Sequence, residues 1–340
     1  MKSLAVEYRP HTFDEVVEQE DVIKILKNQI KYDEIQHCYL FCGGAGTGKT
    51  TLSRIFANEI NHYEGVPIEL DAASNNGVDS MRDLINSART KPLGSQYKVF
   101  ILDEVHMITT AGFNAILKLI EEPPAHAIFI MCTTDPQKIP ATILSRVQRY
   151  DFHRISFKGI CERLKYIYIT EMGNDLVKPD NEAVAYIAKR ADGGMRDAIT
   201  IMDKCLAYSE MLTVENVLTA LGAVSYDTMI ELTKSIIEGR ACHVTDIIEE
   251  VHMSGKDVKE FIKAYMQFVL DLNKLQYGKV WEYVSVPSTY GDKIEPLLTS
   301  SLLTQLLSLL INLLNTIRYS QCAKLEIESE LFVFTKGDTE

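Results

Sequence analysis

The residues best suited to chemistry form a glycine-rich octapeptide that fits the pattern GxxxxGK[ST]. It consists of Gly43, Gly44, Ala45, Gly46, Thr47, Gly48, Lys49 and Thr50, after an apolar run and before a helical pattern. Glycines let successive backbone N–H groups wrap around phosphate oxygens, and the helix N-terminus adds partial positive charge. We therefore expect Lys49 to reach the β- and γ-phosphates of a nucleotide and the Thr50 hydroxyl to hold Mg²⁺. Thr51, the next residue, is a further candidate for nucleotide binding.

Two adjacent acids, Asp103 and Glu104, end a second apolar run, KVFIL. This arrangement is typical of a Walker B segment, in which Asp103 would bind Mg²⁺ through water and Glu104 would polarise the attacking water. A solvated turn is the alternative, and the phosphate-binding loop upstream makes it the weaker one. The tetrad DEVH, which ends at His106, also matches the DExH helicases, so that class stays open at this point.

Two arginines bear on the class of ATPase. Arg146 follows a third apolar run that ends in TTD, and Arg196 opens a helical segment within GGMRDA. An arginine supplied across a subunit boundary can stabilise the transferring phosphoryl group, worth about 10³–10⁵ in rate. An arginine on a lid helix can instead respond to the γ-phosphate by moving the lid. Taken alone, either residue is better explained by a surface ion pair, and only its context favours a role in ATP hydrolysis.

The chemistry needs a scaffold, and the pattern of residues 1–155 predicts one. Apolar runs at 37–42, 98–103 and 127–134 are typical of buried strands, and the segments 50–60 and 112–121 have helical spacing. Strands that alternate with helices predict an α/β fold, a parallel sheet with helices on both faces. We assign residues 1–155 to this phosphate-loop ATPase domain.

The rest of the chain has a helical pattern. Three helices are predicted at 157–171, 180–191 and 195–209. We assign residues 156–220 to a small helical domain and residues 221–340 to an all-α domain with a weak break at 286–291. The long apolar stretch 297–317 carries paired leucines near the helical period, separated by polar residues, which favours an amphipathic helix over a membrane span.

Composition excludes several classes of protein. The chain has 340 residues, of which 46% are hydrophobic and 24% charged, values that exclude a disordered or collagen-like chain. The net charge is −12, from 35 basic against 47 acidic residues. Such a chain cannot attract DNA by bulk charge, so any nucleic-acid contact requires a local basic face.

The cysteines indicate a reducing compartment. There are seven, an odd number, and no two are spaced as CxxC, so a zinc ribbon is not supported. The N-terminus reaches charges and a proline before any apolar stretch of signal-peptide length. We therefore expect a cytoplasmic protein.

Several further motifs carry a family resemblance. They are, in chain order, EYRP (7–10), FDEVVEQE (13–20), the octapeptide, DEVHM (103–107), FNAILK (113–118), EEPP (121–124), TTDPQKIP (133–140) and GGMRDA (193–198). Together they resemble the AAA+ clamp-loader ATPases of the bacterial DNA polymerase III gamma/tau family. The resemblance is close over residues 1–210 and rests on helical pattern beyond them. DExH helicases share the tetrad but not this ordered set.

The resemblance implies roles for individual residues. Those that would frame the adenine side of the nucleotide are Tyr8, Arg9, Pro10 and Val17. Thr134 would be the first sensor, Arg146 the finger acting on a neighbouring subunit's ATP, and Arg196 the second sensor. With Lys49 and Glu104 they would form the catalytic set of an ATPase that has no polymerase active site of its own.

The resemblance also implies partners. Arg82 and Lys118 are candidates for contact with template DNA inside a spiral of subunits, although solvated helix charges are as consistent with them. The third domain would be a collar through which five subunits assemble. The implied partners are other clamp-loader subunits, a sliding clamp, primer–template DNA and a replicative polymerase, and the implied cofactors are ATP and Mg²⁺.

The sequence departs from the family pattern in four places. Residues 61–67 replace the usual four-cysteine module, so no zinc is expected. Val147 stands where the family has cysteine, and Glu18, where it has glycine, puts a charge near the loop at the nucleotide's edge. We also expect the chain to lack, beyond Glu340, the long extension of the family's longer product.

We therefore expect the ATP-hydrolysing motor subunit of a sliding-clamp loader, which opens the ring clamp and loads it on DNA. One alternative is a scaffold subunit with a structural nucleotide, which has no reason to keep both Glu104 and Arg146. Another is an AAA+ remodeller of the branch-migration type. A leucine-rich helical region, not a winged-helix pattern, follows residues 156–220, which would be the lid domain, and this favours the loader.

Overall fold

A computed structural model of the chain describes residues 3–173, 178–222, 224–278 and 284–337. The chain divides into two compact units. Unit 1 comprises Met1–Lys178 and Arg190–Asp203, and unit 2 comprises Pro179–Lys189 and Lys204–Glu340. The chain therefore leaves unit 1, returns to it for one short segment and leaves again. The division into three domains at 155 and 220 remains a prediction.

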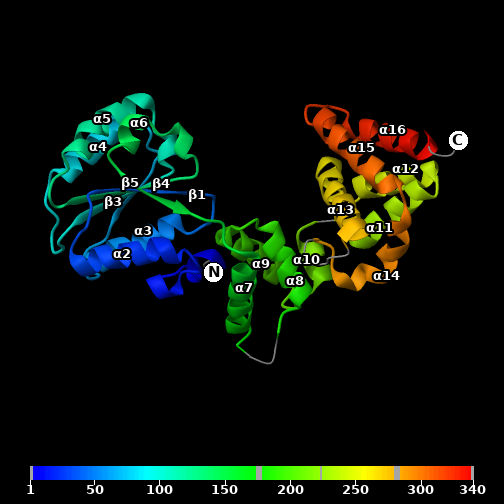
Figure 1. The fold of residues 1–340 in the computed structure, drawn as a ribbon, viewed down its shortest axis with the longest axis horizontal. Helices are drawn as coiled ribbons and strands as arrows, with labels where there is room; N and C mark the ends of the chain where they lie inside the picture. The colour runs from blue at the N-terminus through cyan, green and yellow to red at the C-terminus, as the bar shows by residue number, and fades with distance from the viewer. Residues whose placement is uncertain (1–2, 174–177, 223, 279–283, 338–340) are drawn as a thin grey trace. The chain divides into compact units, whose positions relative to one another are not determined.

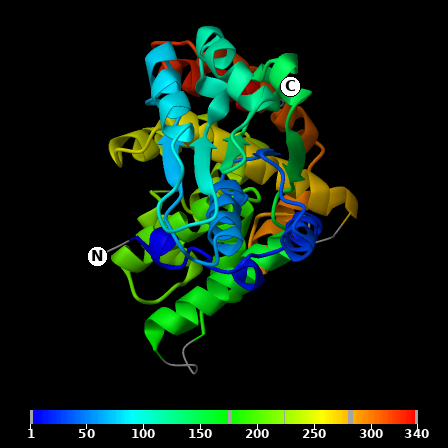
Figure 2. The ribbon, with the colours of Figure 1, turned by 90° about the vertical axis from the view of Figure 1, so that its left-hand side faces the viewer.

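Unit 1 is built on a five-stranded parallel sheet with the order β2-β3-β4-β1-β5. The strands are β1 (Cys38–Gly43), β2 (Ile68–Asp71), β3 (Lys98–Asp103), β4 (Ala127–Thr133) and β5 (Gln148–Phe152). Figure 2 shows the cyan strands β2 and β3 on one side of the sheet and the green strand β5 on the other. The three predicted strands are the central ones, β1, β3 and β4. Because all strands are parallel, their carboxyl ends lie along one edge of the sheet.

Helices cover both faces of this sheet (Figure 1). One face is covered by α4 (Val78–Ala88) and α5 (Thr110–Glu121), the other by α2 (Glu20–Tyr32) and α3 (Lys49–Ile60). Successive side chains of β1 alternate between the two cores: Leu40 joins the core under α4 and α5, whereas Tyr39 and Phe41 join the core under α2 and α3. Both faces of the central strands are thus apolar, which explains their continuous hydrophobic runs.

The burial of the central strands predicts how much a substitution within them lowers the stability of unit 1. Leu40 is 0% exposed, so replacing it by alanine is expected to lower the free energy of unfolding by about 2–5 kcal/mol. The matched control is Leu93→Ala, because Leu93 is 98% exposed and its truncation should change that energy by less than about 0.5 kcal/mol. Chemical denaturation of the two variants checks this, and equal effects would contradict the assigned core.

The remaining elements of unit 1 lie outside the sheet and its four covering helices. They are α1 (Leu4–Glu7), η1 (Phe13–Glu15), η2 (Val105–Met107), η3 (Pro136–Lys138), α6 (Ala141–Leu144), α7 (Phe157–Met172) and the first part of α9 (Met195–Tyr208). The predicted helices at 157–171 and 195–209 correspond to α7 and α9, and the one at 180–191 corresponds to α8 (Asn181–Arg190), most of which belongs to unit 2.

The described part of unit 2 is helical. Its further elements are α10 (Val214–Ala220), α11 (Tyr226–Ile237), α12 (Ala241–Met253), α13 (Val258–Gly278), η5 (Ser288–Tyr290), α14 (Gly291–Ile294), η6 (Glu295–Thr299), α15 (Leu302–Ile317) and α16 (Ala323–Gly337). Apolar side chains of α11, α12, α13 and α15 form its core. The predicted break at 286–291 falls at η5, ahead of α14.

The apolar stretch 297–317 is not the single helix that its spacing predicted. Pro296 lies in the first turn of η6, and the Ser300 hydroxyl accepts a hydrogen bond from the Leu302 backbone N–H at 3.2 Å, so α15 begins only at Leu302. Among the described residues, no single helix has the length and apolar character needed to cross a membrane, and one pair, Ser288–Thr299 with Leu302–Ile317, meets that test only as a segment bent by 99°.

Candidate functional site

A cavity of about 270 Å³ in unit 1 brings most of the predicted nucleotide-binding residues together. The phosphate-binding loop contributes Ala45, Gly46, Thr47, Gly48, Lys49, Thr50 and Thr51. The N-terminal segment contributes Tyr8, Arg9, Pro10 and Val17, and the further predicted lining residues are Asp103, Glu104 and Arg196. The strand ends of β1 and β3 therefore meet the N-terminal segment and the start of α9 at one cavity.

Two glycines shape the phosphate-binding loop. Gly46 and Gly48 have φ of +69° and +100°, in the region that side chains other than glycine's rarely adopt. A Cβ on Gly46 would lie 3.1 Å from the Gly194 Cα, and the Met195 N–H donates to the Gly46 carbonyl at 3.0 Å. The loop and the segment that opens α9 thus contact each other backbone to backbone, which only small residues permit.

Lys49 is held beneath this loop. It is 6% exposed, and its Nζ donates to the carbonyl oxygens of Gly43 at 2.9 Å and Gly44 at 2.7 Å. Burial lowers the pKa of its ammonium group. Gly43 and Gly44 do not line the cavity, and their carbonyls instead fix the lysine. An ammonium group stripped of water in this way is a strong partner for phosphate oxygens.

Thr50 and Asp103 form the candidate Mg²⁺ site. The Thr50 hydroxyl donates to Asp103 Oδ2 at 2.8 Å, and the Glu104 N–H donates to Asp103 Oδ1 at 3.0 Å. Among the described residues, no group of three or more His, Cys, Asp or Glu side chains is arranged to hold a metal ion. Mg²⁺ in phosphoryl-transfer sites binds one or two carboxylates plus substrate phosphates, so a hydroxyl beside a single carboxylate fits that ion.

Glu104 is oriented by its neighbours. Its backbone has a φ of +49°, which turns the chain sharply after β3. Its Oε2 accepts a hydrogen bond from the Thr134 hydroxyl at 3.1 Å, and His106 Nδ1 lies 3.3 Å from the same oxygen. Thr134 itself does not line the cavity. Its only described link to the cavity is this hydrogen bond to the Glu104 carboxylate, which does line it.

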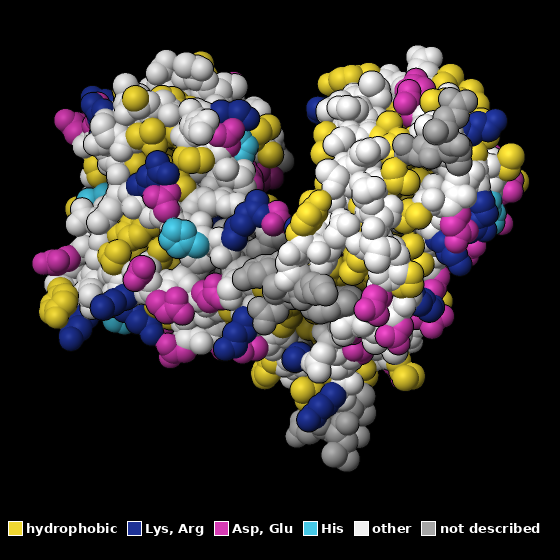
Figure 3. All heavy atoms as spheres, turned by 45° about the vertical axis from the view of Figure 1, so that its right-hand side comes forward, with side chains coloured by type: hydrophobic (Ala, Val, Ile, Leu, Met, Phe, Trp, Pro, Cys, Tyr) yellow, Lys and Arg dark blue, Asp and Glu magenta, His cyan; other side chains and the backbone are white. Residues whose placement is uncertain are grey.

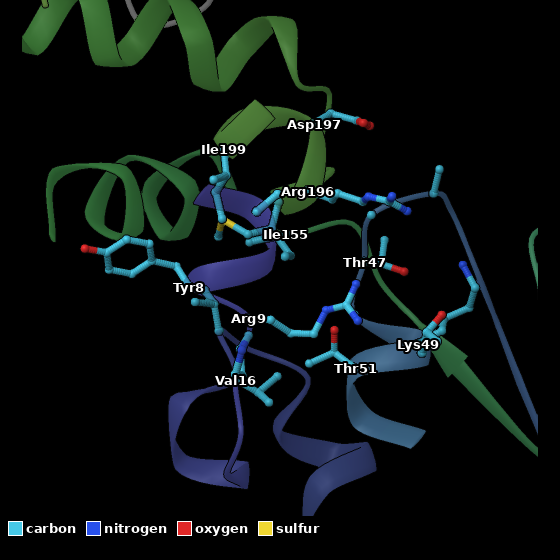
Figure 4. Close-up of a pocket in the computed structure, with 18 of the residues that line it drawn as sticks. Tyr8, Arg9, Val16, Thr47, Lys49, Thr51, Ile155, Arg196, Asp197 and Ile199 are labelled. Carbon is cyan, nitrogen blue, oxygen red and sulfur yellow. The ribbon is translucent and has the colours of Figure 1, made fainter. Parts of the chain in front are cut away.

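The cavity carries mixed charge with basic groups on several sides. Among its described lining residues, the basic ones are Arg9, Lys49, Arg163 and Arg196, and the acidic ones are Asp103, Glu104 and Asp197. Figure 4 shows the Arg9 side chain extending toward Thr47 and Thr51, whereas the Tyr8 ring points away from the loop. Four cationic side chains that line one cavity with a glycine loop suit a polyphosphate.

Tyr8 faces helix α7. Its hydroxyl donates to Glu171 at 2.6 Å, and Arg163 Nη2 donates to the Tyr8 carbonyl at 3.0 Å. Burial, together with the bond to Glu171, raises the pKa of the tyrosine. The N-terminal segment is therefore fastened to α7 beside the cavity.

Three predicted residues lie away from the cavity. Arg146 forms an ion pair with Glu121, Nη2 to Oε1 at 2.8 Å, and donates to the Thr142 carbonyl at 2.7 Å. Arg82 on α4 pairs with Asp79 at 2.9 Å, and Lys118 is exposed on α5. Figure 3 shows acidic and basic side chains interspersed on the face in view.

Sequence reasoning did not identify seven of the lining residues, which are Ala5, Val16, Ile155, Arg163, Met195, Asp197 and Ile199. Met195 and Asp197 flank Arg196 within GGMRDA, so that motif contained their signal. Arg163 lies among other charged residues of a helical stretch, and nothing in its local pattern marks it.

Two family models match consecutive stretches of the chain. Residues 60–156 match the family model described as DNA polymerase III, delta subunit. Residues 160–211 match the model described as DNA polymerase III clamp loader subunit, ATPase lid domain.

Curated relatives extend the match over most of the chain. DNA polymerase III subunit gamma of Buchnera aphidicola subsp. Schizaphis graminum is 30% identical over 312 residues, which cover 85% of both chains. The chain belongs to the DNA polymerase III gamma/tau family. The tau subunit of Bacillus subtilis is 38% identical over 85% of this chain. This gamma/tau member spans only 55% of that tau subunit and 42% of the one from Salmonella typhimurium.

Solved structures confirm the fold class. The Thermotoga maritima RuvB Holliday junction branch migration motor matches 78% of this chain and 91% of its own, with a TM-score of 0.52 and 21% identity. A mutant of the same RuvB protein gives the same TM-score over 68% of this chain and 80% of its own. At this identity the similarity concerns fold alone. The α/β AAA+ domain followed by helices, as predicted, is the architecture of this gamma/tau chain.

The structure shows the surroundings of two residues that depart from the family pattern, Val147 and Glu18. Val147 is half-buried against the core beneath α4 and α5, so an apolar side chain suits that place. Glu18 contacts the start of α7 through Ser156.

Proposed function

We propose that this gamma/tau chain is an ATP-hydrolysing motor subunit of a sliding-clamp loader that opens the clamp and loads it on primer–template DNA. The observation that carries the proposal is the cavity itself. It joins the phosphate-binding loop, the Thr50–Asp103 pair and Glu104, the groups that ATP hydrolysis needs. Membership of the DNA polymerase III gamma/tau family is the reason for proposing that this activity serves DNA replication.

In this proposal Lys49, Thr50 and the loop glycines bind the phosphates, and Tyr8, Arg9, Pro10 and Val17 bound the adenine side. Mg²⁺, held by Thr50 and Asp103, would neutralise charge on the phosphates. Glu104 orients and polarises the attacking water. Thr134, hydrogen-bonded to Glu104, acts as the first sensor, which contacts the γ-phosphate or that water. Arg196 acts from the start of α9, as the second sensor.

Arg146 is proposed to act on the ATP of a neighbouring subunit. Its place outside its own chain's cavity supports that role, because a finger supplied in trans has no partner within its own chain's site. The proposed assembly is a pentamer with other loader subunits, which binds the clamp and the replicative polymerase. Arg82 and Lys118 are proposed to face the DNA.

Steady-state phosphate release tests this proposal. The full chain is assayed with primed DNA, with and without a sliding clamp and partner loader subunits. Turnover stimulated jointly by DNA and clamp is expected. A turnover rate that is unchanged by the clamp but raised by branched duplex DNA would favour a remodeller. Nucleotide binding without any turnover would favour a scaffold subunit.

A further inference from the structure

Two consecutive residues beside the cavity hold an uncommon backbone conformation. Glu18 and Gln19, between η1 and α2, have φ of +61° and +63°. Residues with a Cβ adopt this left-handed region rarely and at an energetic cost. Their surroundings must therefore hold them in place, and the side-chain contacts of both residues show how.

The Glu18 carboxylate binds the N-cap residue of helix α7. Its Oε1 and Oε2 accept hydrogen bonds from the Ser156 N–H at 3.2 and 3.0 Å, and the Ser156 hydroxyl donates to Oε1 as well. Ser156 is itself the N-cap residue of α7 and accepts from the Gly159 N–H at 3.0 Å. A Cβ on Gly159 would lie 2.6 Å from Glu18 Oε1, so the carboxylate lies directly against the first helical turn.

Gln19 fastens the residues just before this cap. It is 6% exposed, its Nε2 donates to the His153 carbonyl at 2.7 Å, and its Oε1 accepts from the His153 N–H at 3.1 Å. These reciprocal bonds and those of Glu18 together hold residues 153–156, the connection between β5 and α7. A negative charge at a helix N-terminus is favourable, and here it also satisfies an N–H at the end of the helix.

The contacts join two parts of the cavity wall. Val16 and Val17, which precede Glu18, line the cavity, and so does Ile155, which precedes Ser156. The Ile155 N–H donates to the Gly193 carbonyl at 3.1 Å, next to the segment that carries Arg196. A displacement of the Val16–Val17 segment by a nucleotide would thus be passed to the start of α7 through two residues.

We propose that Glu18 is a positioning residue that couples nucleotide binding to the orientation of α7. Its carboxylate links the adenine-side wall to the N-terminus of that helix, so nucleotide binding orders the first turn of α7, and loss of the carboxylate weakens nucleotide binding. The inference rests on the proposed function only in taking the cavity as a nucleotide site.

The test uses the full chain and fluorescently labelled ADP with Mg²⁺. Glu18→Ala removes the carboxylate but keeps a residue that is strained at positive φ, whereas Glu18→Gly removes the carboxylate and relieves the strain. Glu20→Ala is the matched control, because Glu20 is an exposed acid two positions away. Hydrogen exchange at the first-turn amides of α7 is followed with and without the nucleotide.

Both Glu18 variants are expected to bind labelled ADP between about two- and thirtyfold more weakly. The nucleotide would then have to order a first turn of α7 that has lost a contact of N-cap strength, and this range is that loss of stability expressed as a change in affinity. Both should also lose the nucleotide-dependent protection of the first turn of α7, while Glu20→Ala keeps it. Parental affinity and protection in Glu18→Gly would overturn the inference, because strain rather than the carboxylate would then be the cause.

Glu18 variants that only melt at a lower temperature, with parental affinity and protection, would overturn it too, because the contact would be merely structural. A parent chain that binds no nucleotide would overturn both the inference and the proposed function. A parent chain that binds ADP normally but hydrolyses ATP without regard to clamp or DNA would overturn the proposed function alone.

Discussion

Replacing Glu104 by glutamine is expected to lower the turnover number for ATP by about 10²–10⁴-fold, the range that a positioned general base contributes. Glutamine keeps the shape of the side chain and can still accept from the Thr134 hydroxyl, which lies 3.1 Å from Glu104 Oε2. It cannot draw a proton from water. Nucleotide binding should survive, because the phosphate-loop contacts of Lys49 and Thr50 are unchanged. Phosphate release and titration with labelled ADP measure the two properties separately.

Glu122→Gln is the control for this variant, since Glu122 is an exposed acid at the end of α5. It should retain parental turnover. If Glu104→Gln kept DNA-stimulated turnover at the parental rate, Glu104 would not be the group that activates water, and the catalytic part of the proposed function would fail.

Replacing Arg146 by alanine is expected to reduce DNA- and clamp-stimulated turnover by about 10³–10⁵-fold, the contribution of an arginine finger. Affinity for nucleotide should stay at the parental value, because Arg146 does not line the cavity of its own chain. Its guanidinium is instead held on the surface by Glu121 at 2.8 Å. A loss confined to the turnover number would mean that the interaction is made only in the transition state.

Mixing the two inactive variants tests action in trans. An interface between an Arg146→Ala chain and a Glu104→Gln chain contains one complete site, because the first chain supplies Glu104 and the second supplies Arg146. The mixture should therefore regain part of the stimulated turnover. Arg149→Ala, at an exposed arginine paired with Asp151, is the control and should remain active. A mixture as inactive as its components would argue against a shared site.

The central strands were predictable, and the edge strands were not, for one physical reason. β1, β3 and β4 are covered on both faces, so their sequences are continuous apolar runs. The edge strand β2 is mostly exposed, and β5 buries only Tyr150 and Phe152 among its five residues. Short, half-exposed strands resemble loops in sequence and become strands only by pairing with β3 and β1.

The residues of the cavity, too, could be predicted only in part from the sequence. Its phosphate side comes from one continuous motif, and residues such as Lys49 and Thr50 can be identified from their spacing alone. Its other walls are formed by residues that only the tertiary fold brings together, such as Ile155 and Arg163. The roles of Glu18 and of the Arg146–Glu121 pair likewise depend on contacts between distant parts of the chain. Spacing along the sequence carries no signal for such contacts.

The passage of the chain between the two units has a consequence for biosynthesis. One wall of the cavity consists of Met195, Arg196, Asp197 and Ile199, in a segment that rejoins unit 1 after the chain has entered unit 2. On the ribosome, all five strands emerge before that segment does. The sheet can therefore fold early, whereas a nucleotide can stabilise the nascent chain fully only after residue 199 has emerged. A ligand that favours the native state thus acts late in translation.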